Sequence, residues 1–213
     1  HLFEEAVQAG VTIEKIFALE NYRDQLATFS QTIWVSEDIL LDLADSQTPQ
    51  GIVAVVQKEE VGQADFSQGK FLFLEDVQDP GNVGTIIRTA DAAGFTGVIV
   101  SEKSADIYSL KTLRSMQGSH FHLPIYRMSS QALLKEIKEA VIPVLATTLS
   151  KDSVDYRELP PIENFVLVMG NEGQGISSLM AESADQLVHI SMKGQAESLN
   201  VAVAAGILIF HLS

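Results

Sequence analysis

The chain has 213 residues, of which 46% are hydrophobic and 20% charged, a composition typical of a globular protein with one large domain or two small ones. It contains no cysteine, which excludes disulfides, zinc–thiolate sites and cysteine nucleophiles. Fourteen basic residues against 28 acidic residues give a net charge of −14, and composition alone argues against a nucleic-acid partner unless the few cations gather on one face.

Residues 1–57 predict a small α/β domain. The pattern predicts helices at 2–9 and 37–44, strands at 16–19 and 52–56, and a turn at Thr48–Gly51. Residues 58–69 are polar and without periodicity, which is typical of a linker. The chain opens without Met, so we expect residues to be missing upstream.

From residue 70 to residue 213 the pattern alternates between strands and helices. Strands are predicted at 71–74, 97–100, 121–126, 142–147, 165–169 and 187–190, and helices at 82–93, 109–116, 130–140, 175–184 and 198–211. Such alternation with apolar strands predicts a parallel sheet that is covered by helices on both faces. No apolar stretch reaches the length of a membrane span, and the first residues do not have the pattern of a signal peptide. We therefore expect a cytoplasmic protein.

Three stretches rich in Gly and Asn follow or overlap predicted strands, where parallel sheets bind ligands. The first is 75–90, in which Asp79 and Asn82 can cap the next helix and Pro80 suits its first turn. Arg88 then lies on an Ile- and Ala-rich helix. The simpler interpretation is a surface arginine paired with Asp91 at i+3.

The second stretch is 166–177, which holds three glycines within six residues. Glycines at this spacing allow a backbone to approach a ligand closely. The pattern G-x-x-G-x-G is neither the dinucleotide fingerprint nor a phosphate loop. A tight strand-to-helix turn explains this stretch equally well when it is taken alone.

The third stretch is 190–206. Ser198 can cap a helix that is apolar on nearly every side, and such a helix must be buried in a core or against a second subunit. Core packing accounts for the Val and Ala residues. It explains Asn200 poorly, because a polar side chain in apolar surroundings needs a hydrogen-bond partner.

Together the three stretches resemble, in order and spacing, the three motifs of the SpoU (TrmH) family of SPOUT methyltransferases. The matching residues are Asn82, Gly84 and Arg88 in the first motif, Gly170, Asn171, Glu172 and Gly175 in the second, and Ile190, Met192, Gly194, Ser198, Leu199 and Asn200 in the third. Ser191 departs from the pattern, because the family usually has proline there. Residues 1–57 resemble the L30e-like substrate-binding domain that precedes this catalytic domain, without its N-terminal part.

The resemblance implies an α/β fold of the SPOUT α/β-knot class, with a deep C-terminal trefoil knot behind a small L30e-like domain. It implies methyl transfer from S-adenosylmethionine to a ribose 2'-hydroxyl of RNA, without a metal. The implied catalytic residues are Arg88, Asn82, Glu172, Ser198 and Asn200. The implied cofactor contacts, largely through backbone groups, are Gly170, Ile190 and Leu199, with Thr147, Met192 and Gly194 as further candidates.

The substrate and the partners follow from the same resemblance. Ribosomal RNA is favoured, with transfer RNA as the alternative, because the front domain resembles the branch that acts on ribosomal RNA. The family pairs through the knot region, so we expect a homodimer in which the helix at 198–211 is covered. Two other classes stay open: a non-enzymatic RNA-binding module with the same fold, and a nucleotide-dependent oxidoreductase, which the missing G-x-G-x-x-G disfavours.

Overall fold

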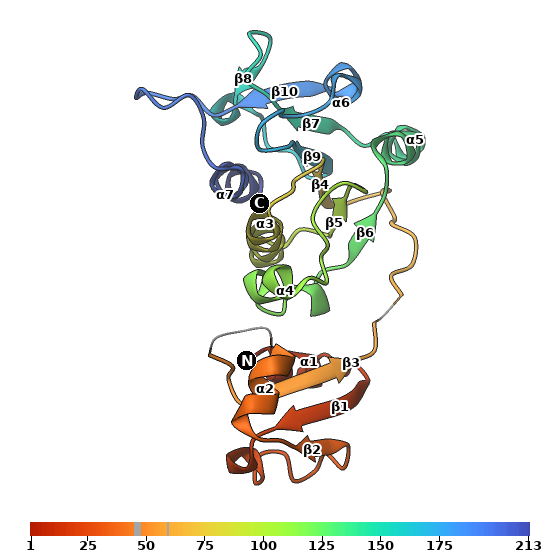
Figure 1. Cartoon of the computed structure of the whole chain (residues 1–213). Helices are drawn as coiled ribbons and strands as arrows, with labels where there is room; N and C mark the ends of the chain where they lie inside the picture. The colour runs from red at the N-terminus through yellow and green to blue at the C-terminus, as the bar shows by residue number, and fades with distance from the viewer. Residues whose placement is uncertain (45–47, 59) are drawn as a thin grey trace. The chain divides into compact units, whose positions relative to one another are not determined.

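A computed structural model describes residues 1–44, 48–58 and 60–213 of the chain (Figure 1). The chain divides into two compact units, His1–Glu60 and Val61–Ser213. The division falls inside the segment predicted as a linker. Phe66, from the end of that segment, is buried in the second unit against Phe71, with 4.8 Å between the ring centroids. Residues 61–69 therefore contribute to the core of the second unit.

In its described residues, the first unit has a three-stranded sheet, two α-helices and one 3-10 helix. Its elements are α1 (Leu2–Gln8), β1 (Ile13–Ala18), the 3-10 helix η1 (Glu20–Tyr22), β2 (Thr32–Trp34), α2 (Glu37–Ala44) and β3 (Ile52–Val56). The strand order is β2-β1-β3, in which β1 is parallel to β2 and antiparallel to β3. The centre of the core is formed by Ile16, Ala18 and Leu26.

The second unit is built on a seven-stranded sheet in the order β6-β5-β4-β9-β7-β10-β8, in which every pair of neighbours is parallel. The strands are β4 (Lys70–Leu74), β5 (Gly97–Val100), β6 (Ile125–Arg127), β7 (Val144–Thr147), β8 (Val154–Asp155), β9 (Phe165–Met169) and β10 (Gln186–His189). The helices are α3 (Pro80–Ala92), α4 (Leu110–Met116), η2 (Ser119–Phe121), α5 (Ser130–Ala140), η3 (Tyr156–Glu158), α6 (Ser178–Ser183) and α7 (Val201–Leu212).

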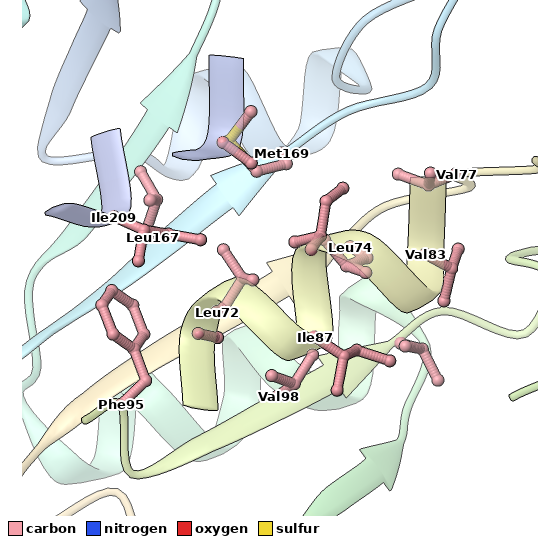
Figure 2. Close-up of a cluster of buried hydrophobic side chains, with 14 of the residues drawn as sticks. Leu72, Leu74, Val77, Val83, Ile87, Phe95, Val98, Leu167, Met169 and Ile209 are labelled. Carbon is pink, nitrogen blue, oxygen red and sulfur yellow. The ribbon is translucent and has the colours of Figure 1, made fainter. Parts of the chain in front are cut away.

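Both faces of this sheet are covered, as the apolar strands predicted. Consecutive strand residues point to opposite faces, so Leu72 and Leu74 of β4 join one core while Phe71 and Phe73 join the other. Helices α3 and α7 cover the first face and α5 and α6 the second (Figure 1). Figure 2 shows Leu72 and Leu74 packed with Ile87 of α3 and Ile209 of α7. No helix in the described ranges has the length and hydropathy of a bilayer span.

The structure differs from the predicted elements in several places. The helix predicted at 175–184 is the shorter α6, and the strand predicted at 16–19 is β1, which begins at Ile13. The strand predicted at 121–126 is the 3-10 helix η2 followed by the shorter strand β6. The short edge strands β2 and β8 were not predicted. The last helix begins at Val201, not at residue 198, because its cap is Asn200, whose side chain accepts hydrogen bonds from the N–H groups of Ala202 (2.9 Å) and Val203 (3.3 Å).

Candidate active site

The three Gly- and Asn-rich stretches meet at one edge of the large sheet. Strands β4, β9, β7 and β10 are successive neighbours, and all run in the same direction. Their carboxyl ends therefore lie along one edge of the sheet, and the loops that follow β4, β9 and β10 all leave from this edge.

The loop after β4 leads into α3, whose N-terminus is firmly capped. The side chain of Asp79 accepts a hydrogen bond from the N–H of Asn82 at 2.9 Å, and Pro80 occupies the first turn. The ammonium of Lys111, on α4, donates to the other carboxylate oxygen of Asp79 at 2.8 Å. This bond from Lys111, followed by that from Asn82, lowers the pKa of Asp79. The start of α3, and with it Asn82, is fixed by these contacts.

Glu172, in the loop after β9, reaches across to the start of α3. Its carboxylate accepts hydrogen bonds from the N–H of Gln78 (3.2 Å), the N–H of Asp79 (3.1 Å) and the side-chain amide of Asn82 (3.1 Å). Burial raises the pKa of Glu172, but the hydrogen bonds from the Asn82 side chain and from backbone N–H groups outweigh it, so the pKa lies below its ordinary value. Glu172 is therefore an ionised acceptor at neutral pH.

Asn200 joins the third motif to the other two. Its amide nitrogen donates to the side-chain oxygen of Asn82 at 3.1 Å, while its own oxygen caps α7. Asn82 thus donates to Glu172 and accepts from Asn200 through the two ends of one amide group. Core packing could not explain Asn200, but both ends of its side-chain amide are hydrogen-bonded. One hydrogen-bonded chain, Glu172–Asn82–Asn200, therefore connects the three motifs.

Two other predicted catalytic residues lie outside this chain of hydrogen bonds. Arg88 is exposed on α3, and across the residues that the structure describes its guanidinium forms neither a hydrogen bond nor an ion pair. The pairing of Arg88 with Asp91 considered from the sequence is not formed, because Asp91 instead lies 3.4 Å from the ring of His122. Ser198 is exposed in the loop between β10 and α7, and it caps no helix.

The glycines of the second motif serve the loop itself. A Cβ at Gly170 would lie 2.3 Å from the carbonyl carbon of Gly175 and 2.4 Å from the nitrogen of Ile176. Asn171 and Gly175 exchange two backbone hydrogen bonds of 3.0 and 2.9 Å across the turn, and Gly175 has a φ of +70°. At Gly170, the space that a side chain would need is therefore filled by the backbone of Gly175 and Ile176.

The residues predicted to contact the cofactor lie at the ends of three neighbouring strands. Thr147 ends β7, and its hydroxyl donates to the carbonyl of Val168 at 2.9 Å. Gly170 follows β9, and Ile190 follows β10, packed against the core. The other predicted contacts, Met192, Gly194 and Leu199, lie in the loop that leads to α7.

The loop between β10 and α7 has backbone N–H groups that are available to bind a ligand. Within the described part of the chain, no N–H group from residue 191 to residue 199 donates a hydrogen bond to another protein group, and a Cβ at Gly194 would have no atom within 4 Å. Leu199 offers apolar surface there, with 37% of its area exposed. Free N–H and carbonyl groups beside apolar side chains suit a ligand that is held through backbone contacts, such as S-adenosylmethionine.

Two residues that hold the site together were assigned no role from the sequence. Glu75, at the end of β4, is only 4% exposed, and its carboxylate accepts hydrogen bonds from the hydroxyls of Ser130 (2.6 Å) and Ser177 (2.8 Å) and from the N–H of Ser177 (2.7 Å). Asn171 donates to the carbonyl of Asp76 at 2.8 Å. A carboxylate directly after a buried strand is the signal that could have revealed Glu75, because a buried charge requires partners.

Comparison with known proteins gives this geometry a context. Residues 69–210 match the model of the SpoU rRNA Methylase family, and residues 1–62 match a model described as RNA 2'-O ribose methyltransferase substrate binding. The chain is 42% identical over 214 residues to the 23S rRNA (guanosine(2553)-2'-O)-methyltransferase RlmP of Bacillus subtilis, a match that covers 100% of this chain and 85% of that protein.

Solved structures agree with these matches. An AdoMet-bound rRNA methyltransferase from Sinorhizobium meliloti superposes with a TM-score of 0.90 at 33% identity, covering 99% of this chain and 83% of that one. A TrmH/SpoU tRNA modifying enzyme of A. aeolicus superposes with a TM-score of 0.60 at 34% identity, and covers 67% of this chain and 73% of that one.

Proposed function

The chain belongs to the SpoU rRNA Methylase family, and from this we propose that it methylates ribosomal RNA by means of Arg88, Asn82, Glu172 and Asn200. It is an RNA (ribose-2'-O-)-methyltransferase that uses S-adenosylmethionine, with the α/β-knot fold of the SPOUT methyltransferases behind a small α/β domain. The observation that carries the site assignment is the hydrogen-bonded chain Glu172–Asn82–Asn200, because it joins three separate motifs at one edge of the sheet.

The bound cofactor supplies the methyl group, and the residues of this chain orient the ribose and manage its charge. Glu172 fixes the amide of Asn82, and Asn200 fixes its other end, so that these groups do not reorganise during the reaction. Glu172 is a poor base, because its carboxylate is held ionised by three donors. Its role in the proposal is to hold Asn82.

Arg88 is proposed to act on the 2'-oxygen. A guanidinium has a pKa above about 12 and does not accept protons at neutral pH, so it cannot be the base. As a donor it stabilises the negative charge that develops on the ribose oxygen as the hydroxyl proton passes to solvent water. Its exposure and its freedom from partners in the described residues support this role, because a committed ion pair would have to break first. Ser198 is also exposed, in the loop between β10 and α7, and in this proposal it helps to orient the ribose.

The cofactor is proposed to bind along the ends of β7, β9 and β10. The backbone groups of Gly170, Ile190 and Leu199 would hold it, with Thr147, Met192 and Gly194 beside them. The free N–H groups of residues 192–199 support this assignment. No metal takes part in the proposed reaction.

Ribosomal RNA is the proposed substrate, in the cytoplasm, where ribosomes are assembled. The cited relatives named for ribosomal RNA alone cover 99–100% of this chain, including its first unit, whereas the A. aeolicus tRNA modifying enzyme covers 67% of it. Lys15, Arg23 and Lys58 are the basic residues of the first unit, and every other Lys and Arg belongs to the second unit. We therefore place most phosphate contacts on the second unit.

The test is methyl transfer in a purified system. The protein is incubated with labelled S-adenosylmethionine and with 23S rRNA or tRNA from cells that lack it, and the modified ribose is mapped. Label should enter a 2'-hydroxyl of the 23S rRNA and not tRNA. Label in tRNA alone would support the tRNA alternative, and no label in either RNA would support a non-enzymatic binding module.

A homodimer is also proposed, because α7 exposes an apolar stripe. Val203 and Phe210 are 52% and 58% exposed, and because they are seven residues apart they lie on the same side of the helix. Val201 and Ala205 of the same helix are buried inside the chain, in the core shared with α3. An exposed stripe of this kind is commonly covered by a second copy about a two-fold axis.

Charged substitutions on the stripe should separate the two copies. We expect the unaltered protein to have twice the mass of one 23.2 kDa chain by light scattering at micromolar concentration. Phe210→Asp should give the mass of one chain, because a carboxylate cannot be buried unpaired at low cost. The matched control is Val141→Asp, which places the same charge at an 86% exposed site outside α7 and should leave the mass unchanged. An unaltered protein that is monomeric would refute the pairing.

A further inference from the structure

The imidazole of His189 is held from both sides at the end of β10. Its Nδ1 lies 3.0 Å from the hydroxyl of Ser153, which precedes β8, and its Nε2 lies 3.2 Å from the hydroxyl of Ser191. His189 is also the register partner of Asp155 in the parallel pairing of β10 with β8. Each ring nitrogen thus lies within hydrogen-bond distance of a serine hydroxyl, one just before β8 and the other just after β10.

The hydroxyl of Ser153 is itself anchored, because it donates to the backbone carbonyl of Ser150. Since its only proton goes to Ser150, this hydroxyl accepts from the Nδ1–H of His189. The paired guanidinium of Arg157 holds the pKa of the neighbouring Asp155 well below its ordinary value. Asp155 is buried and is fixed in turn by Arg157, at 2.7 and 2.9 Å.

Ser191 stands where the family usually has proline, between two residues assigned to the cofactor, Ile190 and Met192. Proline fixes its own φ and stiffens a loop without using side-chain contacts. Serine does not, and the N–H groups of the loop that follows have no hydrogen-bond acceptors among the described residues. The Ser191 side chain therefore supplies a tether at the position where the usual stiffening residue is missing.

We propose that His189 and Ser191 are positioning residues that, with Ser153, form a hydrogen-bonded clasp holding the backbone of Ile190–Met192 in place for the cofactor. The clasp supplies the restraint that a proline at position 191 would otherwise give. This inference rests on the proposed assignment of Ile190 and Met192 to the cofactor.

The test compares cofactor affinities by calorimetry in a double-mutant cycle. Ser191→Ala and His189→Ala should each weaken binding of S-adenosylmethionine by about three- to tenfold, the effect of one or two hydrogen bonds. Ser191→Pro should bind as the unaltered protein does, because proline restores the restraint, and no hydrogen bond of the N–H of Ser191 within the described chain is lost. In the Ser191→Pro background, His189→Ala should then have no further effect.

A second readout needs no cofactor. Amide hydrogen exchange at 190–193 should be faster in Ser191→Ala and in His189→Ala, and close to that of the unaltered protein in Ser191→Pro. If the unaltered protein bound no cofactor, the proposed function would fail, and the exchange rates alone would decide on the clasp. Lower melting temperatures with unchanged affinity and unchanged exchange, or an equal effect of His189→Ala in both backgrounds, would overturn the proposal.

Discussion

Replacing Arg88 with alanine should slow methyl transfer by about 10²–10³-fold, the cost of losing one donor that stabilises charge in the transition state. Affinity for S-adenosylmethionine should stay the same, because Arg88 lies on α3 and not on the loops assigned to the cofactor. The fold should also be unaffected, since the exposed guanidinium has no partner among the described residues. Single-turnover rates on the mapped RNA, together with calorimetry, separate the two effects.

Two further variants sharpen this result. Arg88→Lys keeps the charge but loses the planar fork, so a large loss of rate is expected if the geometry of the donor matters. Lys138→Ala removes an exposed cation from α5, on the opposite face of the sheet, and should leave the rate unchanged. Normal turnover of Arg88→Ala on the same RNA would exclude the proposed role.

The second large effect concerns two glycines that lie inside helices. Replacement with alanine should lower the stability of the fold at one of them and raise it at the other. A Cβ at Gly84 of α3 would lie 2.5 Å from the Cβ of Ser115 and 2.7 Å from the carbonyl oxygen of Thr112. Because Thr112 and Ser115 belong to α4, Gly84→Ala must push the two helices apart. Overpacking of this kind costs about 1–3 kcal/mol, more than the roughly 1 kcal/mol that alanine gains over glycine in a helix.

Gly206→Ala is the matched control. A Cβ at Gly206 of α7 would meet Thr89 at 4.0 Å, which is an ordinary contact. The helix propensity of alanine should then raise the stability by about 0.5–1 kcal/mol. Thermal unfolding should show a lower melting temperature for Gly84→Ala and a higher one for Gly206→Ala. A higher melting temperature for both would mean that α4 can move away from α3 at little cost.

The central elements of the second unit could be predicted from the sequence because they carry strong local signals. Strands β5 and β9 are uninterrupted apolar runs, and α5 has the apolar periodicity of an amphipathic helix, so all three were predicted with their observed bounds. Strands β2 and β8 have three and two residues, too few to show a period, and they were missed. Their existence depends on the neighbouring strands.

The sequence indicated Asn82, Glu172 and Asn200 as candidates for one site, but it could not predict the contacts between them. Ser198 and Asn200 are both good helix caps by local rules, and the sequence favoured Ser198. The structure uses Asn200, whose free amide nitrogen also reaches Asn82, 118 residues earlier in the chain. That choice depends on the order of the strands in the sheet, which no local pattern contains. The same is true of the partners of Glu75 and His189.

The position of β9 between β4 and β7 has a consequence for the biogenesis of the protein. Strand β4 can pair with β5 soon after synthesis, but its other edge is filled by β9, where Phe165 pairs with Lys70, 95 residues later. At roughly 5–20 residues per second, the ribosome leaves that edge open for about 5–20 s. An apolar strand with an unpaired edge invites pairing with other nascent chains. The half-made second unit is therefore the stage at which this protein is most exposed to aggregation and most in need of a chaperone.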